Sequence, residues 1–433
     1  MSKIPNPSQS ETNTAIFERR ESNVRSYARS MPRKFIKAQG AWMHDSNGGQ
    51  YLDFLSGCAS LNYGHNHPIM KEALLEYIEK DGIAQGLDLH TEAKSEFLKA
   101  FETIILKPRK LDYRVMFTGP TGTNAVEAAI KLARKVTKRE LVVSFTNGYH
   151  GMTLGALACT GNAEKRNGAG VPLGNVVHEP FDGYFGEGID TADMLDQRLS
   201  DPSSGLDKPA AILLETVQGE GGLNAASSDW LRKVAEIAKK HGALLIVDDI
   251  QAGCGRTGGF FSFEEMGFTP DIVTMSKSLS GMGLPFAITL FRPNLDIWSP
   301  GEHNGTFRGN NHAFVTATAV LRHFWADSQF QSEVFERGES LRKRLEQIAH
   351  KHGFSTKGKG MMRGVDVGSG EMASKITSNA FDKGLIIETS GAFDEVVKVL
   401  APLTITEAEL TKGLDILEKC IHDAYSEEVD AAA

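Results

Sequence analysis

Acidic residues and a lysine follow two consecutive apolar runs near the middle of the chain. Asp248 and Asp249 come directly after the run 243–247, and Lys277 follows the run 272–275. A carboxylate held against a pyridine nitrogen keeps that nitrogen protonated, which makes the ring an electron sink. A lysine in a water-poor crevice near positive charge has a lowered pKa and can form a Schiff base with an aldehyde. This order of residues favours a site for a flat heteroaromatic aldehyde.

Two further features suit such a ligand if it carries a phosphate group. The segment 121–124 reads Thr-Gly-Thr-Asn at the start of an expected helix, where backbone N–H groups stabilise an anion. Tyr149 offers an aromatic face for a ring. Each feature has an ordinary alternative, since 121–124 could be a helix cap and Tyr149 a core or surface residue. Carboxylates at 248–249 could also belong to a metal site or a solvated loop, and Lys277 could be a surface lysine.

The elements around these residues follow an alternating pattern that brings them together. Short, continuous apolar runs typical of strands buried on both faces lie at 141–145, 210–214, 243–247 and 272–275. Between them the apolar spacing predicts helices, one from Asn124 to Val136 and one from Ser227 or Ser228 to Gly242. The pattern predicts an α/β fold with a mostly parallel sheet sandwiched by helices. Ligands bind such sheets beyond the carboxyl ends of the strands, where the candidate residues lie.

After about residue 325 the pattern changes to that of a smaller α+β domain. We expect a long helix, three short strands and a last helix, at 331–352, 364–367, 385–388, 396–400 and after 406. We therefore predict three parts: an N-terminal segment that joins the small domain, a large ligand-binding domain, and the C-terminal small domain, at 1–55, 56–325 and 326–433.

Composition narrows the class of protein. The chain has 433 residues, 41% of them hydrophobic and 24% charged, and a formal net charge of −8. This mild acidity argues weakly against a nucleic-acid partner. The polar stretch 1–14 lacks the apolar core of a secretory signal, and we expect no membrane span. The 4 cysteines form no metal-binding spacing, so we expect reduced thiols, no metal and a cytoplasmic location.

Three segments together resemble the signatures of class-III pyridoxal-phosphate aminotransferases. They are the segments at 215–222, which reads ETVQGEGG, at 247–258, which reads VDDIQAGCGRTG, and at 276–277. The similarity extends from about residue 40 to about residue 403. It implies the fold-type I architecture, the cofactor pyridoxal 5'-phosphate, small-molecule substrates such as amino acids and 2-oxoglutarate, and a homodimer with active sites at the subunit interface.

The resemblance assigns roles to individual residues around the cofactor. Lys277 matches the Schiff-base lysine and Asp248 the partner of the pyridinium nitrogen. Gln251 matches the residue near the ring hydroxyl, whereas Gly122 and Thr123 match the phosphate cradle.

Three more residues match positions at the edge of the family's site. Tyr149 matches the stacking aromatic, and Thr306 the threonine that reaches the phosphate from the neighbouring subunit. Glu220 matches the acid that gates an anion-binding cation in the family's ω-aminotransferases.

Two departures from the family pattern bear on the substrate. Met152 stands where ω-aminotransferases often carry an arginine for a substrate carboxylate, and Lys398 stands where another arginine is expected. Together with the segments 17–27 and 55–59, Lys398 is most similar to the branch that makes L-2,4-diaminobutyrate from L-aspartate 4-semialdehyde and glutamate. The alternatives are an ornithine, acetylornithine or 4-aminobutyrate aminotransferase, an aminomutase, and a cofactor-binding module without activity. Lys398 could also be a surface lysine on a rim strand.

Overall fold

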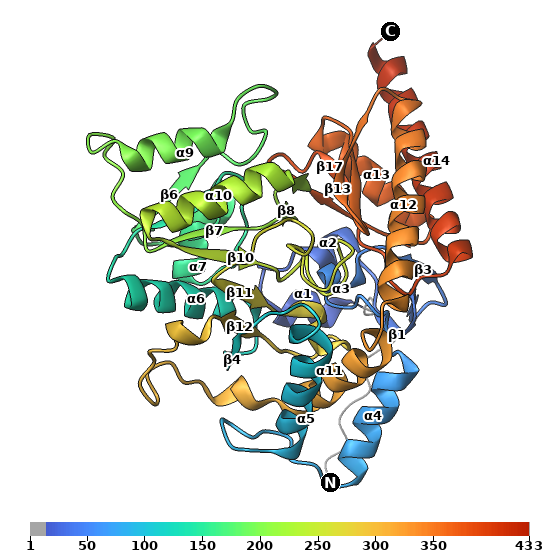
Figure 1. The fold of residues 1–433 in the computed structure, drawn as a ribbon. Helices are drawn as coiled ribbons and strands as arrows, with labels where there is room; N and C mark the ends of the chain where they lie inside the picture. Colours follow the sequence, from blue (N-terminus) through green and yellow to red (C-terminus); the bar gives the residue numbers. More distant parts are fainter. Residues whose placement is uncertain (1–13, 433) are drawn as a thin grey trace.

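The computed structural model describes residues 14–432, and its centre is a seven-stranded sheet (Figure 1). The strand order is β4-β12-β11-β10-β7-β5-β6. Their bounds are Arg114–Phe117, Ile288–Phe291, Ile272–Met275, Leu244–Asp248, Ala211–Leu214, Val142–Phe145 and Val176–Glu179. The five strands from β11 to β6 run parallel to one another. The predicted mostly parallel sheet is therefore confirmed.

The edge of this sheet differs from the prediction. Strand β12 pairs antiparallel with both β11 and β4, so the sheet is mixed at that edge. Neither strand was predicted from the sequence. The run 288–291 follows the glycine-rich segment 281–283 without an intervening helix, so the chain turns back beside β11 instead of crossing over. Antiparallel neighbours need no helical crossover, which explains why the alternating pattern missed β12.

Helices cover both faces of the sheet. Helix α6 (Gly122–Thr137) packs on one face, and α10 (Ser228–His241) lies with α9 (Thr191–Ser200) on the other (Figure 1). The Ser227 hydroxyl oxygen accepts a hydrogen bond from the N–H of Trp230 at 3.2 Å and begins α10. Gly242 ends it with a φ of +65°, a left-handed conformation that favours glycine. Helices α6 and α10 were both predicted from the sequence. Ser227 and Gly242 are typical capping residues, which explains why the ends of α10 could be predicted.

Strands from both ends of the chain form two smaller four-stranded sheets. One has the order β1-β2-β3-β15, and the other has the order β13-β14-β17-β16. Their bounds are Phe35–Gln39, Trp42–Asp45, Gln50–Asp53, Leu385–Ile386, Ser355–Lys359, Met362–Asp366, Val396–Val399 and Glu388–Ser390. A hairpin of β8 (Val217–Gln218) and β9 (Asn224–Ala225) lies apart from these sheets. The pairing of β3 with β15 joins a strand of the N-terminal segment to one of the C-terminal part. The domain boundaries stay a prediction, and residues 1–13 of the N-terminal part lie outside the described residues.

The single strand expected at 385–388 is wrong. The chain instead forms β15, which pairs with β3, and β16, which pairs with β17, so it crosses from one sheet to the other at Ile387. A continuous apolar run cannot show which sheet each residue joins, because β15 and β16 are both largely buried.

The remaining helices connect or flank the sheets. They are α1 (Ala15–Arg20), α2 (Tyr27–Ser30), α3 (Ser56–Ala59), α4 (Pro68–Glu79), α5 (Glu92–Ala100), η1 (Phe101–Leu106), α7 (Leu154–Cys159), α8 (Ala163–Asn167), η2 (Lys277–Ser280), η3 (Pro293–Leu295), η4 (Thr306–Gly309), α11 (Asn311–Phe324), α12 (Gln329–His350), α13 (Gly370–Asp382) and α14 (Glu407–Ala432). Within residues 14–432, no helix combines the length and the apolar character that a membrane span requires.

Candidate active site

The lysine and the first acid lie at the carboxyl ends of adjacent parallel strands. Asp248 ends β10 and is opposite Thr274 in the register with β11, and Lys277 comes three residues after Thr274 at the start of η2. Lys277 has a φ of +49°, a conformation that non-glycine residues seldom adopt and that clusters at functional sites. Its Nζ donates a hydrogen bond to the carbonyl oxygen of Cys58 at 3.0 Å. The structure thus brings Lys277 close to the N-terminal segment.

Asp248 is buried within a network of hydrogen bonds. Its Oδ1 accepts from the Thr274 hydroxyl at 3.1 Å and from the N–H of Ile250 at 3.2 Å. Its Oδ2 lies 2.8 Å from Nδ1 of His150, which is also buried. Burial disfavours the charged imidazole, but the hydrogen bond and the charge of Asp248 outweigh burial and raise the pKa of His150. This network holds the carboxylate in one orientation. The sequence analysis gave His150 no role, although it follows Tyr149 directly.

The start of α6 contains the two residues expected at a phosphate. Gly122 and Thr123 are its first two residues, whose N–H groups have no intrahelical acceptor. A Cβ atom at Gly122 would lie 2.9 Å from Cδ1 of Ile250, so the glycine allows α6 to approach the loop after β10. The Thr123 hydroxyl lies 2.8 Å from that of Thr153. The helix end therefore offers anion-binding groups near the Asp248 loop.

Tyr149 and Gln251 lie around the same region. Tyr149 is half-buried, and its N–H donates to Oε1 of Glu215 at 2.9 Å. Burial raises the pKa of its phenol to about 12, so it stays neutral at physiological pH. Gln251 is buried, and its Nε2 donates to Oε1 of Glu220 at 3.1 Å. Its Oε1 is a buried acceptor with no hydrogen-bond partner among the described residues, and it packs against Gly219, where a Cβ atom would lie 1.7 Å from it.

A cavity of about 850 Å³ adjoins these groups. Lys277, Tyr149 and Glu220 line it, whereas Asp248 and Gln251 lie behind its wall. The N-terminal segment and α13 supply much of the rest, including Arg29 and Arg33, which the sequence analysis missed. The N-terminal segment carries several arginines, and only the fold shows which of them lie at the cavity.

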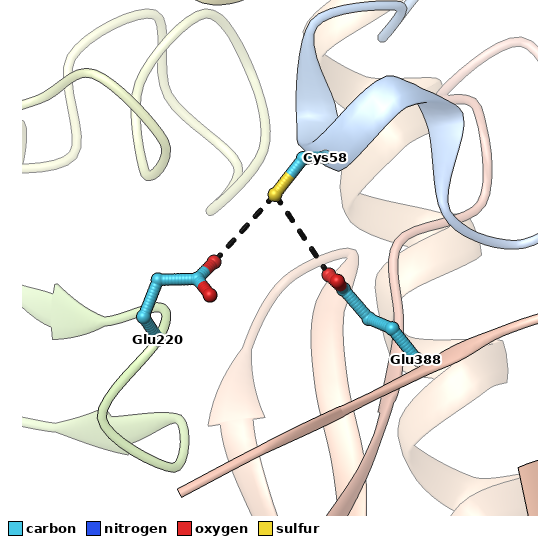
Figure 2. Close-up of side chains that lie close together, drawn as sticks. All are labelled: Cys58, Glu220 and Glu388. Atoms are coloured by element: carbon cyan, nitrogen blue, oxygen red, sulfur yellow. Dashed lines mark hydrogen bonds between the residues drawn. The ribbon is translucent and has the colours of Figure 1, made fainter. Parts of the chain in front are cut away.

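Lys398 lies beside the cavity in a cluster of charged side chains. Its Nζ lies 3.0 Å from Oε1 of Glu220 and 2.8 Å from Oε1 of Glu388. Figure 2 shows that the two glutamates come from different parts of the chain and converge on Cys58. The side chain of Lys398 is 0% exposed, so the alternative of a surface lysine on a rim strand is wrong.

Electrostatics explain how this cluster is ionised. Burial would lower the pKa of Lys398, but the charges of Glu220 and Glu388 outweigh burial and raise it above its usual value. Burial also opposes ionisation of Glu220, yet the ammonium groups of Lys398 and Lys277 outweigh it and hold its pKa well below the usual range. Burial raises the pKa of Glu388, despite the opposing charge of Lys398. An ammonium group thus occupies the position between the carboxylates that a metal ion would need.

Two predicted positions lie away from this cluster. Thr306 begins η4, is exposed, and does not line the cavity of its own chain. Its expected role concerns the site of a second subunit and stays a prediction. Met152 is 51% exposed and lines the cavity, where the related ω-aminotransferases often have an arginine.

Comparison with known proteins identifies the family of the chain. The aminotransferase class-III family model matches residues 24–421. A protein of Vibrio cholerae named diaminobutyrate–2-oxoglutarate transaminase is 58% identical over 409 residues, which cover 94% of this chain and 99% of that protein. A protein of the same name from Halomonas elongata is 55% identical over 419 residues, which cover 95% of this chain and 100% of that protein.

A solved structure shows the same fold. The ornithine aminotransferase of Toxoplasma gondii, described with partial occupancy of pyridoxal phosphate at its active site, has a TM-score of 0.82. The alignment covers 97% of this chain and 96% of that one at 24% identity. At this identity the likeness shows the fold, which is that of the fold-type I enzymes. The family match and the full-length relatives show more: the chain belongs to the class-III aminotransferases, which use pyridoxal phosphate as their cofactor.

Proposed function

We propose that this enzyme transfers the amino group of glutamate to L-aspartate 4-semialdehyde, producing L-2,4-diaminobutyrate and 2-oxoglutarate. The observation that carries the proposal is the 58% identity, over 94% of this chain, to a relative named for this reaction. The buried Lys398, at a position where other family branches are expected to carry arginine, supports the same branch.

The residues around the cavity fit pyridoxal phosphate. The buried, unpartnered Oε1 of Gln251 suits the ring hydroxyl, which can donate a hydrogen bond. The carboxylate of Asp248 suits a protonated ring nitrogen, and the N–H groups at Gly122 and Thr123 suit the phosphate. Lys277 would hold the aldehyde carbon through its Nζ.

Each of these residues has a separate task in the proposed reaction. When bound, pyridoxal phosphate stores the amino group between the two half-reactions and withdraws electrons from the substrate carbon. Lys277 would hold the cofactor until an amine takes its place, and its Nζ would then be free to carry a proton to or from the substrate carbon. Asp248 would keep a proton on the ring nitrogen of the bound cofactor, and His150 holds the Asp248 carboxylate in place. Because the amino group waits on the enzyme, ping-pong kinetics follow.

Glu220 and Lys398 would serve the carboxylates of the substrates. Glu220 belongs to the turn between β8 and β9, and it shields the Lys398 ammonium from the cavity. Movement of the Glu220 side chain would free that ammonium for a substrate carboxylate, since Lys398 itself lies behind the wall. Lysine presents a compact charge instead of the planar fork of arginine, so the two residues favour different carboxylate positions.

The biological setting is part of the same proposal. We infer a homodimer, because Thr306 is exposed and expected to serve the site of a neighbouring subunit, and because Phe307 beside it is 65% exposed. A cytoplasmic location is supported by the free state of the 4 cysteines, which suits a reducing compartment. The reaction would form the first step of ectoine biosynthesis.

Identification of the amine product tests the proposal directly. The purified enzyme, loaded with pyridoxal phosphate, receives aspartate 4-semialdehyde and glutamate, and we expect diaminobutyrate and 2-oxoglutarate in equal amounts. Ornithine, acetylornithine and 4-aminobutyrate serve as competing amine donors. Preference for one of these would contradict the proposal, and amine formation without a need for glutamate would indicate an aminomutase.

A further inference from the structure

The ammonium group of Lys398 has one carboxylate partner more than its charge requires. Glu220 and Glu388 both contact its Nζ, at 3.0 and 2.8 Å. One carboxylate is enough to neutralise a buried lysine, and a further buried carboxylate is costly unless another cation compensates it. The other cation facing both acids is Lys277, whose Nζ the proposed reaction engages with the cofactor. A cationic group of a ligand in the cavity would compensate the surplus acid while Lys277 is engaged.

The two acids differ in how they are held. Glu388 lies on β16 directly opposite Lys398 on β17, so the strand register fixes their contact. Its Oε2 also accepts a hydrogen bond from the hydroxyl of Tyr27 at 3.2 Å. Glu220 belongs to a turn instead, and its side chain can move without breaking a strand. Glu388 is therefore the acid whose position stays constant during the reaction.

Glu388 is also placed where a substrate can reach it. It lines the same cavity as Lys277, together with Tyr27 and Cys58. The close-up in Figure 2 shows its carboxyl group directed toward Cys58, and the carbonyl oxygen of Cys58 accepts the hydrogen bond from Lys277 at 3.0 Å. Lys277 and Glu388 thus contact different atoms of Cys58 and line one cavity, so a short substrate in that cavity would have both side chains along its wall.

The substrates of the proposed reaction differ in one cationic group. Diaminobutyrate and aspartate 4-semialdehyde carry an α-ammonium group that takes no part in the transfer, whereas the only amine of glutamate is the one transferred. We propose that the carboxylate of Glu388 binds this unreactive α-ammonium group and so selects substrates that carry it. This inference rests on the proposed function and assigns a specificity-determining residue that the sequence motifs do not contain.

A pair of matched amines tests the inference. 4-Aminobutyrate equals diaminobutyrate without the α-amino group, so the ratio of their kcat/KM values measures recognition of that group. In the Glu388→Gln holoenzyme we expect this ratio to fall about ten- to a hundredfold, the effect of losing a charge-assisted hydrogen bond. The glutamate half-reaction, followed by the absorbance of the bound cofactor, should change less than the diaminobutyrate half-reaction. Glu388→Asp keeps the charge and should restore part of the ratio.

Two controls make the outcome decisive. Asp382→Asn removes another acid from the cavity wall, and the ratio should stay at the wild-type value. An equal fall in Asp382→Asn, an unchanged ratio in Glu388→Gln, or an equal loss of both half-reactions would overturn the inference. Failure of the proposed function gives a different result from failure of this inference, because the wild-type enzyme itself would then not use diaminobutyrate. If Glu388→Gln does not fold, the Glu388→Asp and Tyr27→Phe variants provide the same ratio.

Discussion

At the scale of single residues, the chemistry depends on a few side chains held by short contacts. Lys277 is the lysine that the strand order brings beside Asp248, and we predict that Lys277→Ala abolishes turnover and the visible absorbance of the bound cofactor. Lys165 is a matched control, since it also lines the cavity with its Nζ 4.8 Å from the centre of the Tyr149 ring. The Lys165→Ala variant should keep the absorbance. A yellow, active Lys277→Ala enzyme would show that the role belongs to another residue.

Asp248 carries the second prediction at this scale. We expect Asp248→Asn to retain the cofactor but to lower kcat by several decades, because each pKa unit lost at the ring nitrogen is about 1.4 kcal/mol. The matched control is Thr274→Val, which removes one hydrogen bond to the same carboxylate and leaves its charge. Such a bond contributes about 0.5–1.5 kcal/mol, so kcat should fall by no more than about tenfold. Steady-state kinetics check both, and a kcat of Asp248→Asn within about threefold of wild type, less than about 1 kcal/mol, excludes the electron-sink role.

At the scale of elements, the pairing of β16 with β17 places the buried ammonium of Lys398 beside the carboxylate of Glu388. Removing Lys398 leaves Glu220 and Glu388 without the ammonium that both contact. An uncompensated buried charge costs about 3–5 kcal/mol, so we predict that Lys398→Ala lowers the free energy of unfolding by about that amount. Urea unfolding measures it. Lys99→Ala, which breaks an exposed ion pair with Glu96, should cost much less because water screens that pair.

Steady-state kinetics of the Lys398→Ala variant test whether this lysine binds a substrate carboxylate. If Lys398 binds a substrate carboxylate, Lys398→Ala should lower kcat/KM for glutamate and diaminobutyrate about ten- to a hundredfold, with a smaller change in cofactor affinity. Lys398→Arg keeps the charge and should shift the preference between the two amines instead of abolishing it. Unchanged KM and kcat for both amines in Lys398→Ala would limit the lysine to a structural role.

At the scale of the whole molecule, two buried acids link stability to pH. Burial raises the pKa of Glu215 from 4.5 to about 7, although the charge of His150 opposes it, and burial raises that of Asp249 from 3.8 to about 7. The folded state therefore binds these protons more tightly than the unfolded state. Their contribution to stability is complete below the unfolded pKa values and is lost as the pH rises through about 7.

The Asp249→Asn variant isolates one of these acids. Other acids have lowered pKa values and act in the opposite direction, so the useful quantity is the difference between wild type and variant. We predict that this difference in the free energy of unfolding changes by up to about 1.4 kcal/mol per pH unit across the window from about 4 to about 7. Urea unfolding of the holoenzyme at several pH values measures it, and parallel stability curves would contradict the assignment.

The sequence alone was enough to predict the parallel part of the central sheet, two of the helices that cover it and the order of the site residues. The sequence shows apolar runs at 210–214, 243–247 and 272–275, capping residues at Ser227 and Gly242, and the motif positions of Asp248 and Lys277. All of these depend on neighbours along the chain. Such local signals can be recognised in the sequence alone, because the burial of a strand and the capping of a helix depend on residues within one strand or one helical turn. The roles assigned to the site residues stay predictions.

The tertiary structure decided the contacts between residues far apart in the chain. Tyr27 and Glu388 are in contact although 361 positions separate them in the chain, and 178 positions separate Lys398 from its partner Glu220. Neither contact produces a recognisable spacing in the sequence. The sequence alone left open whether Lys398 faces solvent or is buried, and it could not show the turn at Ile387 that moves the chain between two sheets. The physical reason is that a buried charge is stable only beside its counter-charges, and the packing of separate elements determines which counter-charges come within reach.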